Sequence, residues 1–319
     1  MRDRLEREIE YLRLSVTQNC NLNCIYCRPS EKEKNDNCCQ GLTPQEIEKA
    51  VGAMVRLGIK KVRITGGEPL TRIDVCDIIS RISGIPQIED ISMTTNGMNL
   101  AAQAENLKRA GLRRINISLD SLRSDRFQFI TGGGRLENVL EGIEKAVSVG
   151  LNPVKINVVL MKGLNDDEVE DFIRLAKDQP LEVRFIELMP VGKFGENNRD
   201  KIVFNSDILA GHPMLKPARD RFQSGPATMY ELPGYQGRIG FISPMGHRFC
   251  ASCNRVRLTC DGKLKLCLGD NAEADIVGIL RENTENIDEA IHELIYNKPE
   301  GHNFNRRFTS NRGMNAIGG

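Results

Sequence analysis

Two groups of three cysteines are the residues of this sequence best suited to carry chemistry. The first group follows a strand-like run near the N-terminus and the second lies far downstream: Cys20, Cys24 and Cys27, then Cys250, Cys253 and Cys267. Three thiolates can bind three irons of a cubane iron–sulfur cluster, whereas a complete set has four. Each group would therefore leave one iron open to another molecule, and an open coordination position is typical of catalytic metal sites.

The same cysteine spacing also allows a structural zinc site. Such sites surround one ion with four Cys or His ligands, and C-x2-C pairs are common in them. The sequence has four histidines, and no H-x3-H pair supplies a missing ligand. Spacing alone leaves both interpretations open: an enzyme with two iron–sulfur clusters, or a zinc-stabilised binding module.

Length and composition indicate a folded chain in a reducing compartment. With 319 residues and a hydrophobic fraction of 40%, we expect two domains, or one barrel with an appendage. The net charge of +1 argues against a broad nucleic-acid surface or an anionic-membrane surface. Ten cysteines with metal-ligand spacing and a strongly charged start without a secretory segment favour a cytoplasmic protein.

Strand-like runs alternate with amphipathic helical stretches through the first two thirds of the chain. The strand candidates are 11–17, 60–66, 90–96, 114–120, 153–161 and 181–189. Successive β–α units give parallel strands joined by right-handed crossovers. We therefore predict an α/β fold, an incomplete (β/α)6 TIM-type barrel, over residues 1–199.

The pattern changes from about residue 200. Short segments separated by Pro and Gly turns look like antiparallel strands: 229–232, 237–243, 255–260 and 263–267. We predict that residues 200–319 form a C-terminal α+β extension that carries the second cysteine group.

The alternation of side chains along the predicted barrel strands indicates a polar interior. In the first strand Leu12 and Leu14 alternate with Arg13 and Ser15, so the two sets face opposite sides. The apolar rows must pack against the helices, which leaves the polar rows inside. The cations expected inside are Arg13, Lys61, Arg63, Lys155 and Arg184. Because burying unpaired cations costs several kcal/mol each, we expect a wet cavity that binds a polyphosphate.

Gly66-Gly67-Glu68-Pro69 follows the second predicted strand. Its two glycines would let a ligand approach the backbone closely. Together with the C-x3-C-x2-C group, this motif resembles the radical S-adenosylmethionine superfamily. The resemblance implies that the open iron binds the amino and carboxylate groups of S-adenosylmethionine. In that superfamily one electron from the reduced cluster cleaves the sulfonium and gives a 5′-deoxyadenosyl radical.

The second cysteine group narrows the resemblance. Asn254-Arg255-Val256-Arg257 directly follows its second cysteine, and this arrangement is similar to the family of GTP 3′,8-cyclases of molybdenum cofactor biosynthesis. Further matching segments are 12–17, 63–70, 94–97, 114–120, 155–157 and 184–189, with a terminal Gly318-Gly319. The resemblance implies a lyase that converts GTP to (8S)-3′,8-cyclo-7,8-dihydroguanosine 5′-triphosphate, the first step of that pathway.

The family implies a role for each matching residue. The first triad would hold the cluster that binds S-adenosylmethionine, and the second triad would hold another 4Fe–4S cluster, whose open iron meets guanine. The S-adenosylmethionine site would contain Tyr26, Gly67, Ser118 and Met189. The GTP site would contain Arg13, Lys61, Arg63, Thr94, Lys155, Arg255 and Arg257. Of these, Arg13, Arg255 and Arg257 would be catalytic.

The resemblance also implies partners. A flavodoxin or ferredoxin would supply electrons, cyclic pyranopterin monophosphate synthase would take the product, and the chain would form a homodimer, with no nucleic-acid or membrane partner. A peptide-modifying maturase with an auxiliary cluster is the nearest alternative. It fits less well, because such enzymes carry longer cysteine-rich modules and need no cationic interior.

Two questions stay open at the level of sequence. Cys260 lies between Cys253 and Cys267 and could replace Cys267 as a ligand, although the family spacing favours Cys267. The family tail reaches the active site, but Ala316 stands where that tail often carries an aromatic residue. Docking of Gly318-Gly319 is therefore left undecided.

Overall fold

One mixed sheet of twelve strands organises the protein. The computed structural model describes residues 1–27, 41–218, 225–247, 249–281, 287–304 and 310–318. The strand order is β12-β11-β10-β1-β2-β3-β4-β5-β6-β9-β8-β7. The six predicted barrel strands are present and parallel, in chain order: β1 (Tyr11–Ser15), β2 (Lys61–Thr65), β3 (Asp90–Thr95), β4 (Arg114–Ser118), β5 (Val154–Leu160) and β6 (Leu181–Glu187).

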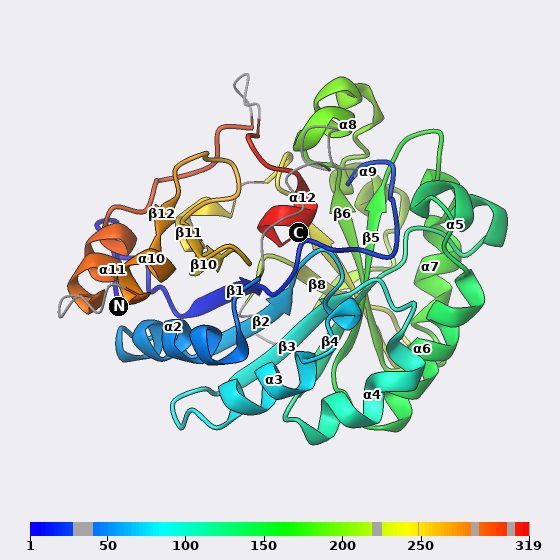
Figure 1. Ribbon diagram of the computed structural model, residues 1–319. Coiled ribbons are helices and arrows are strands. Elements are labelled where there is room, and N and C mark those ends of the chain that lie inside the picture. Colours follow the sequence, from blue (N-terminus) through cyan, green and yellow to red (C-terminus); the bar gives the residue numbers. More distant parts are fainter. Residues whose placement is uncertain (28–40, 219–224, 248, 282–286, 305–309, 319) are drawn as a thin grey trace.

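Helices join these strands and cover the outer face of the sheet (Figure 1). They are α2 (Pro44–Arg56), α3 (Val75–Ser83), α4 (Leu100–Arg109), α5 (Ser124–Thr131), α6 (Leu136–Ser148) and α7 (Val169–Leu175). The start of α2 shows why they form where they do. The Thr43 hydroxyl accepts a hydrogen bond from the Glu46 N–H, the Glu46 carboxylate accepts one from the Thr43 N–H, and Pro44 occupies the first turn. The incomplete α/β barrel is confirmed.

The C-terminal part of the chain extends this sheet at both edges. At one edge β9 (Arg238–Ile242) pairs in parallel with β6, followed by the antiparallel β8 (Thr228–Glu231) and β7 (Lys216–Pro217). At the other edge β10 (Arg255–Leu258) pairs in parallel with β1, followed by the antiparallel β11 (Lys263–Lys265) and β12 (Ala274–Asp275).

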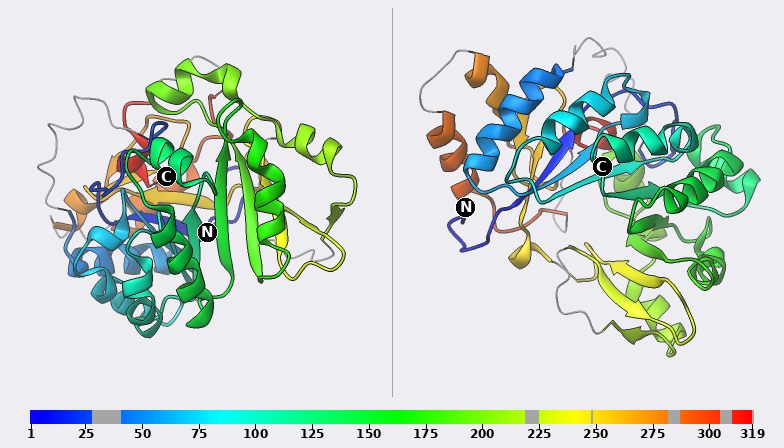
Figure 2. Two further views of the ribbon diagram at one scale, coloured as in Figure 1. Left: turned by 90° about the vertical axis from the view of Figure 1, so that its right-hand side faces the viewer. Right: turned by 90° about the horizontal axis from the view of Figure 1, so that it is seen from below.

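The predicted antiparallel pairing is therefore correct for both hairpins, β8–β9 and β10–β11; the additional parallel pairing of β9 with β6 and of β10 with β1 is not predicted from the sequence. The physical reason is that an incomplete barrel has two open edges whose backbone N–H and C=O groups need partners. Figure 2 shows the yellow strands of one edge and the orange helices of the other on opposite sides of the parallel strands. The division into 1–199 and 200–319 stays a prediction, and the sheet continues across it.

The remaining helices lie around the edges of the sheet. They are α8 (Gly192–Asn197), α9 (Asn205–Gly211), α10 (Ile276–Arg281), α11 (Ile287–Tyr296) and α12 (Met314–Ile317). Four short 3-10 turns complete the described elements: η1 (Pro69–Thr71), η2 (Asp166–Glu168), η3 (Arg199–Lys201) and η4 (Cys250–Ser252). Helices α10 and α11 both contact α2. The short helix α12 lies near the carboxyl end of β1 (Figure 1).

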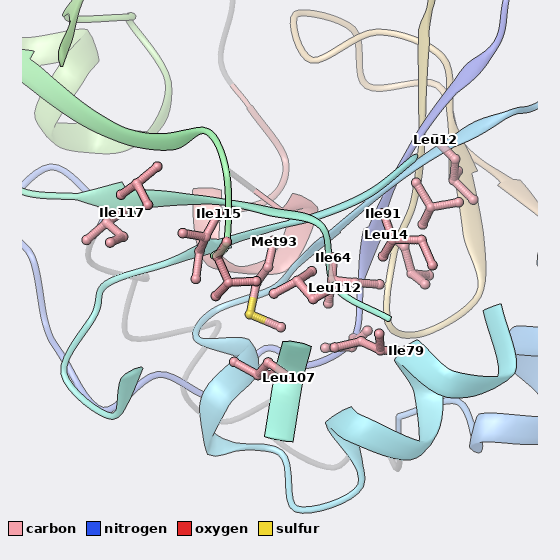
Figure 3. Close-up of a cluster of buried hydrophobic side chains, with 14 of the residues drawn as sticks. Leu12, Leu14, Ile64, Ile79, Ile91, Met93, Leu107, Leu112, Ile115 and Ile117 are labelled. Carbon is pink, nitrogen blue, oxygen red and sulfur yellow. The ribbon is translucent and has the colours of Figure 1, made fainter. Parts of the chain in front are cut away.

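The main hydrophobic core lies between the sheet and the outer helices. Leu12 and Leu14 on β1 and Ile64 on β2 are completely buried, and they belong to the same apolar cluster as Ile79 of α3 and Leu107 of α4 (Figure 3). The alternation predicted from sequence is thus confirmed for the apolar side of these strands. The polar side chains between them face the interior of the barrel. None of the described helices is both long and apolar enough to cross a membrane.

Candidate active site

Both cysteine triads line one cavity of about 520 Å³ inside the barrel. The six sulfur-bearing residues come from distant parts of the chain: Cys20, Cys24 and Cys27 after β1, and Cys250, Cys253 and Cys267 around the β10–β11 hairpin. All six are free thiols. The sheet topology explains their meeting, because β10 lies directly beside β1.

Backbone hydrogen bonds hold the loop that carries the first triad. The N–H of Cys27 donates to the Cys24 carbonyl at 3.0 Å. The N–H groups of Asn23 and Ile25 donate to carbonyls at the end of α5, both at 2.9 Å. The Tyr26 hydroxyl donates to the Asp120 carboxylate at 2.5 Å, and burial raises the pKa of Asp120 to about 6. The loop is therefore anchored to the segment after β4 and to the end of α5.

Gly66 and Gly67 allow the first triad's loop to lie against β2. A Cβ on Gly67 would lie 2.4 Å from the Asn19 carbonyl oxygen, and one on Gly66 would lie 2.6 Å from that of Thr17. The Gly67 N–H donates to the Thr17 carbonyl at 2.7 Å. A side chain on Gly66 or Gly67 would therefore collide with the protein backbone. The sequence suggested instead that these glycines leave room for a ligand. Gly67 lines the cavity as well.

Glu68 joins three loops at this end of the barrel. Its fully buried carboxylate accepts hydrogen bonds from the Leu70 N–H at 2.9 Å, the Thr95 hydroxyl at 2.7 Å and the Asn96 N–H at 2.6 Å. The Asn96 amide in turn donates to Asn21 in the first triad's loop at 2.8 Å. Burial raises the pKa of Glu68 to about 7. The sequence predicts that Glu68 fixes its own turn, and the hydrogen bond from Leu70 agrees with this; the contacts with Thr95 and Asn96 of another loop are not predicted.

The four residues expected around S-adenosylmethionine all line the cavity: Tyr26, Gly67, Ser118 and Met189. They come from the first triad's loop and from segments at the carboxyl ends of β2, β4 and β6. The carboxyl ends of barrel strands are where catalytic residues of such folds gather.

A row of three arginines crosses β2, β1 and β10. Arg13 is in register with Arg63 on one side and with Arg257 on the other. All three line the cavity. Burial, then Arg257 and Arg63, lower the pKa of Arg13, and burial lowers those of Arg63 and Arg257 to about 10. At these pKa values Arg63 and Arg257 stay cationic at neutral pH. Within the described residues, the guanidinium groups of Arg63 and Arg257 have no carboxylate partner.

The cations on the other side of the cavity are paired. Lys155 Nζ lies 2.6 Å and Arg184 Nη2 lies 2.7 Å from the Glu182 carboxylate, and Arg114 lies 2.9 Å from Asp90. The expectation of unpaired cations is therefore wrong for Lys155 and Arg184. Arg114, Glu182 and Tyr11 also line the cavity and were missed. Strand alternation could have found them, because each shares a face with a predicted interior residue.

The prediction of an unpaired Lys61 inside the cavity is also wrong. Its ammonium lies 2.6 Å from the Glu10 carboxylate, and Lys61 is not among the residues that line the cavity. Thr94, in contrast, lines the cavity, and so do Arg255 and Arg257. The Arg255 guanidinium lies over the Phe249 ring at 4.8 Å from its centroid.

Cys260 points away from this site. It is 2% exposed and lines a smaller, separate cavity next to residues 16–19. Cys267 lines the main cavity together with Cys250 and Cys253. The structure therefore favours Cys267 as the third member of the second triad.

The C-terminal tail reaches the arginine row. The Gly318 carbonyl accepts hydrogen bonds from Arg13 Nε at 3.3 Å and from Arg257, and the Ile317 carbonyl accepts one from Arg257 at 3.1 Å. Gly318 has φ of 69°, and a Cβ there would lie 2.2 Å from the Thr65 hydroxyl oxygen. The tail thus docks as far as Gly318, while Gly319 lies outside the described residues.

The thiol arrangement is compatible with clusters. All three cysteines of each triad line the cavity, and the cysteines of a cubane bind different irons, so their sulfurs need not converge on one centre. Several buried polar atoms of cavity-lining residues also lack hydrogen-bond partners within the described residues: Thr94 Oγ1, Asn157 Oδ1 and Arg184 Nε. These residues line the cavity and can bind a polar ligand.

Comparisons with known proteins agree with this geometry. Residues 14–176 match the family model of the radical SAM superfamily, and residues 181–304 match that of Molybdenum Cofactor Synthesis C. The chain is 49% identical over 321 residues to the GTP 3′,8-cyclase of Alkaliphilus oremlandii (strain OhILAs), covering 100% of both chains. It is 46% identical over 307 residues to that of Listeria monocytogenes serovar 1/2a, covering 95% of this chain and 92% of the relative. The chain belongs to the GTP 3′,8-cyclase family.

Solved structures support the fold of this family member. Streptococcus suis SuiB bound to its precursor peptide SuiA gives a TM-score of 0.61 at 16% identity, covering 91% of this chain and 66% of SuiB. SuiB bound to S-adenosylmethionine gives 0.57 at 15% identity, with 92% and 64% covered. The chain thus spans about two thirds of the length of SuiB. Identity this low shows a shared fold and leaves the activity to other observations.

The close approach at Gly67 makes a testable prediction. Because an added Cβ would collide with the Asn19 and Gln18 carbonyls, Gly67→Ala should displace the first triad's loop and lower the iron bound there after anaerobic reconstitution. Iron and sulfide analysis measures this. Gly52→Ala is the matched control, since a Cβ at Gly52 meets nothing within 4 Å. Full iron content in Gly67→Ala would show that the loop does not need this contact.

Proposed function

We propose that this chain is a radical S-adenosylmethionine lyase that converts GTP to (8S)-3′,8-cyclo-7,8-dihydroguanosine 5′-triphosphate, the first step of molybdenum cofactor biosynthesis. The observation that carries the proposal is that both cysteine triads and the arginine row line one cavity. The full-length similarity to GTP 3′,8-cyclases supports the substrate and the reaction.

Membership of the superfamily implies a 4Fe–4S cluster and S-adenosylmethionine, and the first triad has the ligands for that cluster. Cys250, Cys253 and Cys267 would hold another 4Fe–4S cluster on the same cavity. When bound and reduced, a cluster on the first triad would supply the electron for the reductive cleavage of S-adenosylmethionine, and so the radical chemistry that joins ribose C3′ to guanine C8. The chain's own task is to hold C3′ near that radical and to exclude water.

The arginine row is suited to the triphosphate. Guanidinium groups bind phosphate oxygens in pairs, and Arg63 and Arg257 have no competing carboxylate among the described residues. Arg255 and Arg257 lie on β10 beside the second triad, so with Arg13 they can contact the part of GTP that reacts. Thr94 and Lys155, which also line the cavity, complete the proposed set of GTP-binding residues. Lys61 is left out, because its ammonium lies against Glu10 outside the cavity.

The partners belong to the same proposal. A flavodoxin or ferredoxin would reduce the first cluster, and cyclic pyranopterin monophosphate synthase would consume the product. A homodimer and a cytoplasmic location stay predictions of the sequence.

The reaction can be tested directly. The reduced, anaerobic protein with S-adenosylmethionine and GTP is expected to give the cyclised nucleotide, identified by mass analysis. Arg257→Ala should lower its formation by about 10²-fold or more, because a preorganised cationic donor is lost, while leaving the iron content unchanged. Arg174→Ala removes an arginine that is 67% exposed and serves as the control. Unchanged product formation in Arg257→Ala would contradict the assignment. Modification of a peptide in place of GTP would favour the maturase alternative.

The binding of GTP should depend on pH through Lys155. Burial, then Arg184, lower the pKa of Lys155 to about 8. Below that pH the ammonium is present and attracts phosphate. Above it the free protein must take up a proton to bind, so the GTP dissociation constant should rise by up to tenfold per pH unit.

Calorimetry at a series of pH values, with oxidised clusters and no S-adenosylmethionine, measures this dependence. Lys155→Arg keeps its charge throughout and should flatten the curve. An equally steep curve in the variant would assign the titration to another group.

A further inference from the structure

Two buried cations lie behind the second triad. Lys298 is 2% exposed and Arg7 is 6% exposed, and neither lines the main cavity. They therefore cannot contact a ligand there. Buried cations are costly unless their donors and charge are compensated, so their partners indicate what they do.

Lys298 joins the chain segments of two ligand cysteines. Its ammonium donates to the Arg255 carbonyl at 2.9 Å and to the Leu266 carbonyl. Arg255 follows Cys253 by two residues, and Leu266 directly precedes Cys267. Within the described part of the chain, Lys298 has no carboxylate partner.

Arg7 holds the third cysteine and the segment that carries Lys298. One of its terminal nitrogens donates to the carbonyls of Cys250 and Glu300, both at 3.0 Å. The other donates to the carbonyls of Lys298 at 3.2 Å and Pro299 at 2.8 Å. Its Nε donates to Asp3 at 2.6 Å, which neutralises Arg7 itself. Together the two cations tie down the backbone at all three cysteines.

The Lys298 ammonium lies next to the second triad. The two carbonyls that it contacts belong to the residue two positions after Cys253 and to the residue directly before Cys267. Thiolates that bind a cluster bring negative charge into this buried region, and an ammonium without a carboxylate partner can compensate it.

We propose that Lys298 is a positioning residue for the second cluster, which it serves in two ways. It holds the Cys253 and Cys267 segments together, and its buried positive charge stabilises the thiolate-bound cluster and makes it easier to reduce. This inference rests on the proposed function only in that the second triad holds a cluster.

Lys298→Met tests the role, because it keeps the length of the side chain and removes both the donors and the charge. After anaerobic reconstitution of the full-length chain, we expect about half of the wild-type iron, with the first cluster retained. Lys265→Met is the matched control. Lys265 is equally buried at 1% exposed, but its ammonium donates to the Asp270 carbonyl and lies 3.6 Å from Glu273. It should keep the full iron content.

Lys298→Gln separates charge from hydrogen bonding, because an amide donates without a charge. Cys20, Cys24 and Cys27 are replaced by Ser in the full-length chain, so that the second cluster is the only one. Its midpoint potential, followed by electron paramagnetic resonance, should fall by at least the equivalent of a tenfold change in the reduction equilibrium, about 59 mV for one electron.

Three results would overturn the inference. They are full iron content in Lys298→Met, equal iron loss in Lys298→Met and Lys265→Met, and an unshifted potential in Lys298→Gln. A wild-type chain that binds only one cluster would instead contradict the proposed function and remove the second cluster on which this role depends.

Discussion

The repulsion among three aligned arginines is the constraint on which the rest of the site depends. Arg63, Arg13 and Arg257 occupy equivalent positions on three neighbouring strands, and their side chains face one enclosed space. Such a row cannot be packed with apolar side chains as in a filled barrel. The interior must therefore stay open to water or to an anion. The Gly318 carbonyl supplies part of the compensation by accepting hydrogen bonds from two of the three.

The incomplete barrel makes this arrangement possible. A sheet closed by its own strands would pair β1 with another barrel strand, whereas here the open edge of β1 receives β10 from the C-terminal part of the chain. This single pairing brings Arg257 into register with Arg13 and places the second triad on the cavity that the first triad lines. The two triads are held by different means. Backbone hydrogen bonds and the close packing of Gly66 and Gly67 against the loop position the first triad. The buried cations Arg7 and Lys298 position the second.

Much of the barrel and of the site could be predicted from the sequence, because side-chain alternation is a local signal. It placed Arg13, Arg63, Lys155 and Arg184 inside, and the structure agrees. Pairing between distant segments leaves no such signal. The parallel attachment of β10 depends on which edge stays open, and the neutralisation of Lys155 depends on Glu182 of the next strand. Side-chain alternation also places Lys61 on the interior face of β2, but its ammonium pairs with the Glu10 carboxylate outside the cavity. The sequence likewise does not reveal why a glycine is needed at position 67, because the carbonyls that lie against it belong to another loop.

The affinity of the cavity for a triphosphate tests this account most directly. Calorimetry on the anaerobic protein with both clusters oxidised can compare GTP with guanosine, which shares the base and ribose. If the arginine row provides most of the binding free energy, GTP should bind at least about a hundredfold more tightly, roughly 2.7 kcal/mol. Equal dissociation constants for the two ligands would contradict the claim that the buried arginines are there to bind an anion.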